Sequence, residues 1–189
     1  MPSADSSGIT PRRKWLPLIR YSHIVSAAVR DVLEIEPLEE AGGAGMTPRQ
    51  FLLLEFIARD AHHLDDVAKF LRVSPPAATK AVDKLEERGL VTRSGCSDDR
   101  RLTLLSCSDR GAGLVERYRA LQEEAMELAM ASFDDDDLSR LAQLLERFSL
   151  ALVSAENHAD ELCLRCSGHY DRDCPLRFTP RGCAYLALH

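Results

Sequence analysis

Four of the six cysteines lie close together in the last part of the chain, in the pattern Cys163-x2-Cys166-x7-Cys174-x8-Cys183. Cys163 and Cys166 have the spacing of a two-ligand knuckle, and the two later thiolates could complete the coordination of one metal centre. Cys174 is followed by proline, a step that is frequent in segments that hold iron–sulfur clusters. The pattern therefore predicts a metal site, with an iron–sulfur cluster favoured over zinc.

Other arrangements of these thiols stay open. Structural zinc more often uses two short cysteine pairs, and only one such pair is present here. His158 or His169 could replace one cysteine as a ligand, and disulfides or independent thiols are a third alternative. Cys107 lies outside the cluster and is expected to fill an apolar strand position as a small hydrophobic residue. Cys96, at the expected wing tip, is also expected to be a bystander, with a thiol switch as the alternative.

Composition narrows the class of protein. The chain has 189 residues, of which 45% are hydrophobic and 29% charged, as in ordinary globular proteins. No apolar stretch approaches the ~20 residues of a membrane helix, so we expect no membrane partner. The first 14 residues lack the apolar core of a signal peptide, which predicts a cytoplasmic protein. The net charge of −6 does not by itself suggest nucleic acid, although it can hide a local basic face.

Apolar periodicity and start signals predict the helices that would position these residues. Apolar residues at spacings of three and four indicate a first helix from Lys14 to about Glu40, with an end or kink at Pro37. Thr47-Pro48-Arg49-Gln50 has the pattern of a capped helix start, and that helix should end near Asp60, with Phe51, Leu54 and Ile57 or Ala58 on its inner face. Residues 64–71 are expected to form a third helix.

Residues 74–107 have the pattern of a helix followed by a hairpin. Ser74 can cap a helix that continues to about Arg88, with Ala78, Val82 and Leu85 facing inward and Gly89 as its left-handed end. Strand-like runs at 90–93 and 102–105 flank a polar tip. The order of elements predicts a mainly α fold, a winged helix-turn-helix with a small β-hairpin wing.

Long amphipathic helices are predicted at both ends of this unit. One seam is formed by Leu114, Tyr118, Leu121, Ala125 and Leu128, and a second by Leu138, Leu141, Leu145, Phe148 and Leu152. One small domain cannot cover so much apolar surface, so we expect dimerisation helices. The expected divisions are a disordered N-terminus (1–12), an N-terminal dimerisation helix (13–45), the DNA-binding domain (46–111), C-terminal dimerisation helices (112–158) and the cysteine-rich metal-binding tail (159–189).

Several motifs, in this order, resemble those of the MarR family of transcription regulators. Thr47 to Phe51 resembles the family's "TPxQF" opening, and residues 73–91 resemble its recognition helix and exit. Arg93 with Asp98-Asp99-Arg100-Arg101 resembles the wing signature. Residues 106–111 resemble the closing "LTxxG", with Cys107 in place of leucine and Ser108 in place of threonine. The resemblance covers residues 47–152.

The resemblance implies a homodimer that binds double-stranded DNA at a pseudo-palindromic operator, most often as a repressor. Each recognition helix would enter a major groove, and each wing would reach a minor groove, where Asp99 would orient Arg101. Small residues at the helix start would let the backbone approach DNA, and Thr79 could contact a phosphate or a thymine methyl group. The expected DNA-contacting residues are Ser74, Pro76, Ala77, Thr79, Lys80, Lys84, Arg93, Asp99, Arg100 and Arg101.

Three hypotheses about regulation follow. In the first, an iron–sulfur centre on the four cysteines changes DNA binding in response to redox state, iron or a gas. In the second, zinc is structural and a small-molecule effector binds between the helices, near Tyr21, His23 and Phe51. The third makes the chain a zinc-dependent, protein-binding regulator of the anti-sigma kind. No nucleophile–base pair or phosphate-binding loop is present, so we expect no enzyme.

Overall fold

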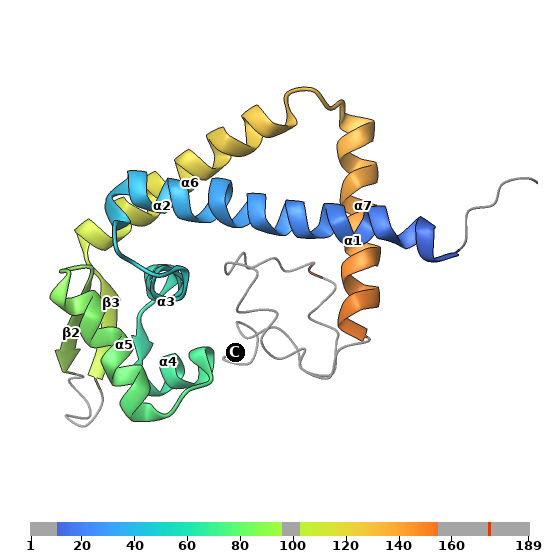
Figure 1. Cartoon of the computed structure of the whole chain (residues 1–189). Coiled ribbons are helices and arrows are strands. Elements are labelled where there is room, and N and C mark those ends of the chain that lie inside the picture. The colour runs from blue at the N-terminus through green and yellow to red at the C-terminus, as the bar shows by residue number, and fades with distance from the viewer. Residues whose placement is uncertain (1–10, 96–102, 155–173, 175–189) are drawn as a thin grey trace, which may run out of the picture.

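The computed structural model describes residues 11–95 and 103–154, together with Cys174. Helices form most of this part of the chain, and one small antiparallel sheet accompanies them (Figure 1). The predicted mainly α, winged helix-turn-helix fold is confirmed. In chain order the elements are α1 (Pro11–Ala28), η1 (Val29–Ile35), α2 (Glu36–Leu38), η2 (Glu39–Gly43), α3 (Pro48–Arg59), β1 (His62–His63), α4 (Leu64–Leu71), α5 (Pro75–Glu87), β2 (Val91–Gly95), β3 (Thr103–Cys107), α6 (Asp109–Met130) and α7 (Asp135–Ser154).

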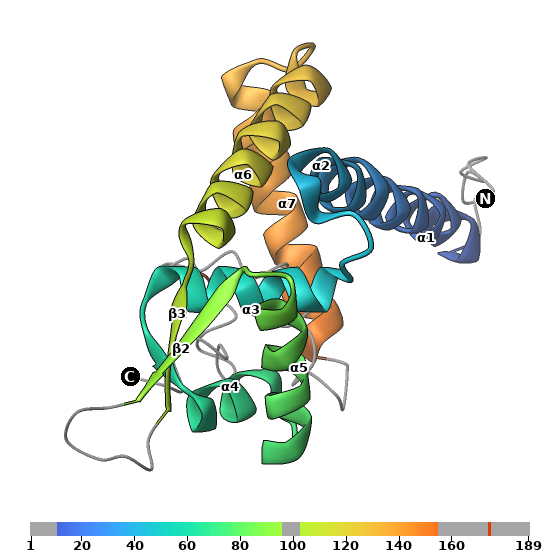
Figure 2. The same ribbon diagram turned by 90° about the vertical axis from the view of Figure 1, so that its left-hand side faces the viewer.

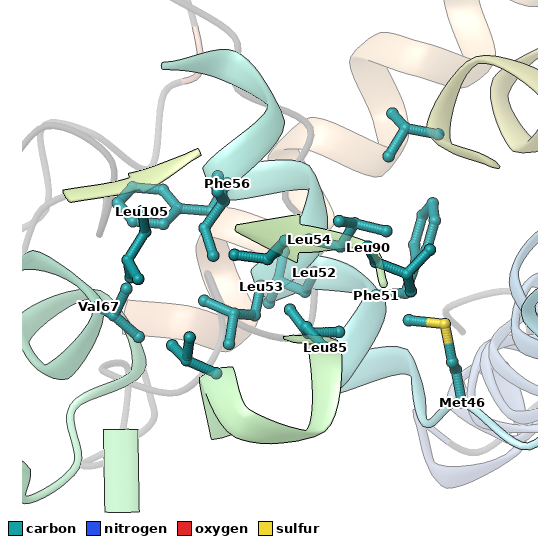
Figure 3. Packing of buried hydrophobic residues seen from close by; sticks show 14 of the residues in the cluster. Met46, Phe51, Leu52, Leu53, Leu54, Phe56, Val67, Leu85, Leu90 and Leu105 are labelled. Atoms are coloured by element: carbon teal, nitrogen blue, oxygen red, sulfur yellow. The ribbon is translucent and has the colours of Figure 1, made fainter. Parts of the chain in front are cut away.

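The hydrophobic core is built around α3, which the other elements of the winged helix surround (Figure 3). Every residue from Phe51 to Ile57 is buried. The buried surface of this helix is therefore wider than the single inner face predicted from the sequence. A helix that is covered on nearly all sides is apolar nearly all round, and the run Phe51-Leu52-Leu53-Leu54 has that character. Helix α5 contributes Ala78, Val82 and Leu85, all fully buried, as predicted.

Three helix starts have side-chain caps, and the first of them, at Thr47, is a predicted one. The side chain of Thr47 accepts a hydrogen bond from the Gln50 N–H (3.2 Å), and the Gln50 side chain accepts one from the Thr47 N–H (2.8 Å). Asp134 accepts from the Asp137 N–H at the start of α7. Ser108 opens α6 in the same way. Ser74 was expected to cap α5, but its side chain makes no cap hydrogen bond, so this part of the prediction is wrong.

The sheet has the strand order β1-β3-β2, with all neighbours antiparallel. The hairpin of β2 and β3 is the predicted wing, and Val91 pairs with Cys107 at its base. Strand β1 was not predicted, because two residues are too few to show an alternating pattern. It pairs His62 with Leu105, and thereby places the start of α4 beside the wing (Figure 2).

The first helical region is longer than predicted. It begins at Pro11 rather than Lys14, and Pro37 does not end it, because helical turns continue to Gly43. The segments on both sides of Pro37, η1 and η2, are π-helical. A proline lacks the N–H that an α-helix needs at that position, and the wider turns are where the chain accommodates this loss.

Helix α1 extends away from the winged helix, and α7, which follows the far end of α6, stands apart from it (Figure 1). Both leave large apolar side chains exposed, among them Trp15, Ile19, Tyr21, Leu144 and Leu152. The predicted apolar seam of α6 has a buried and an exposed part. Leu114 and Tyr118 belong to the core of their own subunit, whereas Leu128 is 74% exposed. In the described part of the chain, no helix is long and apolar enough to span a bilayer.

Candidate nucleic-acid interface

Helix α5 presents one face to the core and the opposite face to solvent. Ala78, Val82 and Leu85 hold the helix on α3 and the sheet, while Ser74, Pro76, Ala77, Lys80 and Lys84 are exposed and Thr79 is partly buried. These are the side chains predicted to contact DNA from this helix, and the structure brings them onto one solvent-facing side. The first turn carries only small or ring-closed side chains, so nothing large stands between its backbone and a ligand.

Thr79 has a narrower chemical role than its residue type suggests. Its hydroxyl donates to the Pro75 carbonyl one turn earlier, at 3.1 Å. A phosphate oxygen needs a donor, and this hydroxyl has already given its hydrogen to the helix backbone. In this conformation Thr79 can therefore offer its methyl group to a thymine, but it cannot donate a hydrogen bond to a phosphate.

Two features hold the turn between α4 and α5 in place, a left-handed residue in the turn and a hydrogen bond from α3. Arg72 ends α4 in the left-handed conformation, with φ of 53°, which few residues other than glycine adopt. From α3, the Arg49 guanidinium donates to the Leu71 carbonyl at 2.8 Å. A charged donor to one of the unpaired carbonyls at the end of α4 stabilises that end. The angle between α4 and α5 is therefore set by α3, the best-buried helix.

Arg93, on strand β2 of the wing, forms ion pairs with the recognition helix α5. Its guanidinium lies 2.5 Å from Asp83 and 3.3 Å from Glu86, both on α5. The side chains are partly exposed, so the net contribution of these pairs to stability is small, about 1 kcal/mol or less. Their electrostatic effect on a polyanion is larger, because Arg93 neutralises two carboxylates on the helix that must approach phosphates. The structure therefore places Arg93 among groups that position the interface.

The junction behind the recognition helix is closely packed. Gly89 follows α5 with φ of 69°, as predicted for a left-handed helix end. Its carbonyl accepts a hydrogen bond from the Ser108 hydroxyl (2.7 Å), and the Ser108 hydroxyl oxygen accepts one from the Gly111 N–H (3.0 Å). The Ser108 N–H donates to the Leu90 carbonyl at 3.0 Å. One serine thus connects the end of α5 to the start of α6.

The family model that matches this chain is described as the MarR family, over residues 44–102. Those are the residues that carry α3, α4, α5 and the first strand of the wing. Over these residues the chain is similar to the MarR family. This confirms the resemblance seen in the motifs. The match ends before the four cysteines, so it does not bear on them.

Individual known proteins are similar to this chain over most of its length. The "HTH-type transcriptional repressor MdtR" of Bacillus subtilis is 25% identical over 125 residues, which cover 66% of this chain and 81% of the relative. The crystal structure of Escherichia coli MarR without ligand is 26% identical, with a TM-score of 0.53, and covers 70% of this chain and 96% of that one. The YusO protein of Bacillus subtilis shares the fold, with a TM-score of 0.64 at 20% identity, over 76% of this chain and 99% of that one.

The similarity to the MarR family bears on two expectations. It supports a transcription regulator of the DNA-binding winged-helix type, and it agrees with the expectation that the chain is not an enzyme. The wing residues Cys96, Asp99, Arg100 and Arg101 lie outside the described residues, and so do Cys163, Cys166 and Cys183. Their expected contacts with DNA or metal remain predictions.

The remaining candidate residues are placed as follows. Cys107 packs against the core, as expected, and burial raises the pKa of its thiol, which makes it a poor nucleophile. Phe51 is buried and lines a small hollow with Leu38, Glu55 and Tyr118. Tyr21 and His23 stand exposed on α1 and do not line that hollow. The three residues considered for an effector site are therefore not brought together within one subunit.

Two groups that shape this interface are not predicted from the sequence. The sequence places Arg93 among the DNA-contacting residues without its partners on α5, and it marks Arg49 only as part of the start of α3. Both contacts join residues of different elements: Arg49 and Leu71 are 22 positions apart, and Arg93 and Asp83 are 10 positions apart. No local pattern marks such a pair. An acidic residue such as Asp83 on an otherwise DNA-facing helix was the only available sign that a cation must lie beside it.

Proposed function

We propose that this protein is a homodimeric repressor of the MarR family that binds double-stranded DNA at a pseudo-palindromic operator. Helix α5 carries the proposal, because its core face is fully buried while Lys80 and Lys84 stand free on the other side. A helix presented in this way fits the major groove. Arg100 and Arg101 of the wing would contact the flanking minor groove, where the negative potential is strong. Such a regulator would act in the cytoplasm.

The homodimer is supported by the exposed faces of the long helices. Apolar side chains on α1 and α7 that stand at least 37% exposed include Leu18, Ile24, Val25, Leu141, Leu145 and Phe148. Soluble monomers rarely leave so much contiguous apolar surface in water. A second copy of the chain would cover it around a two-fold axis, and the same axis would relate two recognition helices to two half-sites.

DNA binding and dimerisation can be tested together. We expect the full-length protein to have the mass of a dimer by light scattering, and to enrich a sequence with inverted half-sites from random double-stranded DNA. The centres of the half-sites should lie about one helical turn apart or a multiple of it. A monomer, or the enrichment of no sequence over several rounds, would contradict the proposal.

We further propose that Cys163, Cys166, Cys174 and Cys183 hold an iron–sulfur cluster, with zinc as the alternative. Among these residues the structure describes Cys174, which is partly exposed and makes no disulfide, so its thiol is available as a ligand. Four thiolates are the usual ligand set of such clusters. When bound, the cluster would supply a centre whose assembly depends on redox state, iron supply or a gas.

The location of the cysteines suggests how this centre would affect DNA binding. Cys163 follows the end of α7, at Ser154, by nine residues. Ligands that close around a metal restrict the chain that carries them, and metal binding is linked to folding free energy. If α7 belongs to the dimer interface, a change at the cysteines alters how the two subunits are held. The distance between the two recognition helices would then change with it.

The metal proposal predicts a specific result for protein purified without oxygen. We expect brown protein with broad absorbance and matching amounts of iron and acid-labile sulfide. Cys163→Ser with Cys166→Ser should remove both colour and iron, whereas Cys107→Ala, outside the cluster, should retain them. The measurements are the visible spectrum and metal analysis of one sample. Colourless protein with about one zinc per chain would replace the cluster by a structural zinc site.

The coupling has its own test. Operator affinity should differ between the metal-loaded and the metal-free protein across a series of salt concentrations. Equal affinities would mean that the metal does not regulate DNA binding. In that case the second hypothesis, structural zinc with a small-molecule effector, would be the one to pursue.

A further inference from the structure

The carbonyl of Leu33 lacks its normal α-helical partner. In an α-helix the carbonyl of one residue accepts from the N–H four positions later, and four positions after Leu33 is Pro37, which has no N–H. The structure fills this place from another helix. The Tyr118 hydroxyl (3.1 Å) and the Gln122 side-chain amide (2.8 Å), both on α6, donate to the Leu33 oxygen.

The two donors are themselves held in place. The Gln122 amide also donates to the Tyr118 hydroxyl oxygen, at 3.1 Å. The ring of Tyr118 is 3% exposed and packs on Phe51, with 4.2 Å between ring centroids. Burial, together with the nearby carboxylates of Glu55 and Glu34, raises the pKa of Tyr118 well above its usual value. The phenol is therefore protonated and able to donate at any physiological pH.

This contact lies where α1 leaves the winged helix. Leu33 is in the π-helical segment η1, just after α1, and α6 crosses the chain there (Figures 1 and 2). The N-cap residue of α6 is Ser108, whose hydroxyl donates to the Gly89 carbonyl behind the recognition helix. Helix α6 therefore connects the C-terminal end of α1, called here the base of the α1 arm, to the end of α5.

We propose that Tyr118 and Gln122 are positioning residues for operator binding. Their hydrogen bonds to the Leu33 carbonyl set the angle at which α1 leaves the winged helix, and so set the separation of the two recognition helices in the dimer. The proposal rests on the homodimeric DNA-binding function proposed above. Helix α1 has 18 residues and is about 27 Å long, so a tilt of roughly 10° at its base moves its far end by about 5 Å.

The test is the dependence of affinity on half-site spacing. The operator selected by the wild-type protein is prepared with its natural spacing, and with one base pair added or removed between the half-sites. For Tyr118→Phe combined with Gln122→Ala, we expect affinity for the natural spacing to fall about tenfold, because two hydrogen bonds are lost in each subunit. The preference for that spacing over the altered ones should shrink. The dependence on salt should stay unchanged, because no phosphate contact is removed.

Folding is monitored in parallel. Tyr118→Phe retains the ring that packs on Phe51 and removes only the hydroxyl, so this single variant should keep the dimer mass and a cooperative thermal transition. Gln143→Ala makes the same chemical change as Gln122→Ala at an exposed position away from the junction, and this variant should bind as the wild type does.

Two outcomes would overturn the proposal. One is unchanged affinity at every spacing, and the other is an equal loss at all three spacings, which indicates general destabilisation. If the wild-type protein itself selects no operator, the proposed function fails before the junction is tested. A fall at the natural spacing with a reduced spacing preference supports the positioning role.

Discussion

Replacing Gly111 with alanine is expected to destabilise the protein by about 3 kcal/mol, at the upper end of the range for overpacking in a folded interior. A Cβ atom at this position would lie 2.2 Å from the Leu90 carbonyl oxygen and 2.8 Å from the Cys107 sulfur. The Leu90 oxygen cannot yield easily, because it is backbone and accepts a hydrogen bond from the Ser108 N–H. Helix α6 would have to move away from the wing. Urea unfolding of the full chain measures the loss.

Gly113 provides the matched control, two residues further along the same helix. A Cβ atom there would meet nothing within 4 Å, and the residue is exposed. Alanine is favoured over glycine in a helix interior, so Gly113→Ala should stabilise the protein by about 0.5–1 kcal/mol. The two substitutions should thus have opposite signs. A Gly111→Ala protein as stable as the wild type would mean that α6 does not approach the wing as closely as described.

The second large effect is expected on DNA affinity. Lys80 is exposed on the DNA-facing side of α5 and forms no ion pair among the described residues. We expect Lys80→Ala to weaken operator binding by about tenfold or more, because the dimer loses two phosphate contacts. The plot of log affinity against log salt should flatten by about 1.8, from ~0.9 per contact. Fluorescence anisotropy at several salt concentrations gives both quantities.

Lys14 offers a control of the same residue type. It lies on α1, at the end of the arm that is farthest from the recognition helix (Figure 1). Lys14→Ala removes the same charge and should leave the slope unchanged. A Lys80→Ala protein with wild-type slope would remove this residue from the interface. A uniform loss across different DNA sequences would assign Lys80 to phosphate, whereas relaxed preference at one base pair would assign it to a guanine.

The parts of this fold that sequence predicts are those whose cause is local. Thr47 and Gln50 cap each other within one turn, and the inward spacing of Ala78, Val82 and Leu85 follows from the helix period alone. The bounds of α4 are the predicted ones. The outward placement of Lys80 and Lys84 needed nothing more than that same period.

What could not be predicted depends on residues far apart in the chain. The local sequence predicts that Pro37 ends or kinks its helix, because proline lacks the N–H that the helix needs. The helical turns continue past Pro37, and the Leu33 carbonyl that it leaves without an α-helical donor accepts instead from Tyr118, 85 positions further along the chain. The strand β1 is of the same kind, because His62 pairs with Leu105. Arg93 and Asp83 are only 10 positions apart, but they lie on different elements, so no single periodic pattern joins them. Ser74 differs, since it has the right residue type and position for a cap, but its side chain does not take that role. The metal site rests on residue spacing, and spacing alone does not choose between iron and zinc.

The two edge strands of the sheet affect whether the protein can aggregate through strand pairing at high concentration. Strand β3 is paired on both sides, so only β1 and β2 have open edges. The first is two residues long, and the second is five residues long, carries Arg93 and ends in glycine. Short edges that carry charge are poor templates for a strand from another molecule. Concentrated solutions should therefore resist amyloid-like growth through this sheet, and contacts between chains are left to the helices.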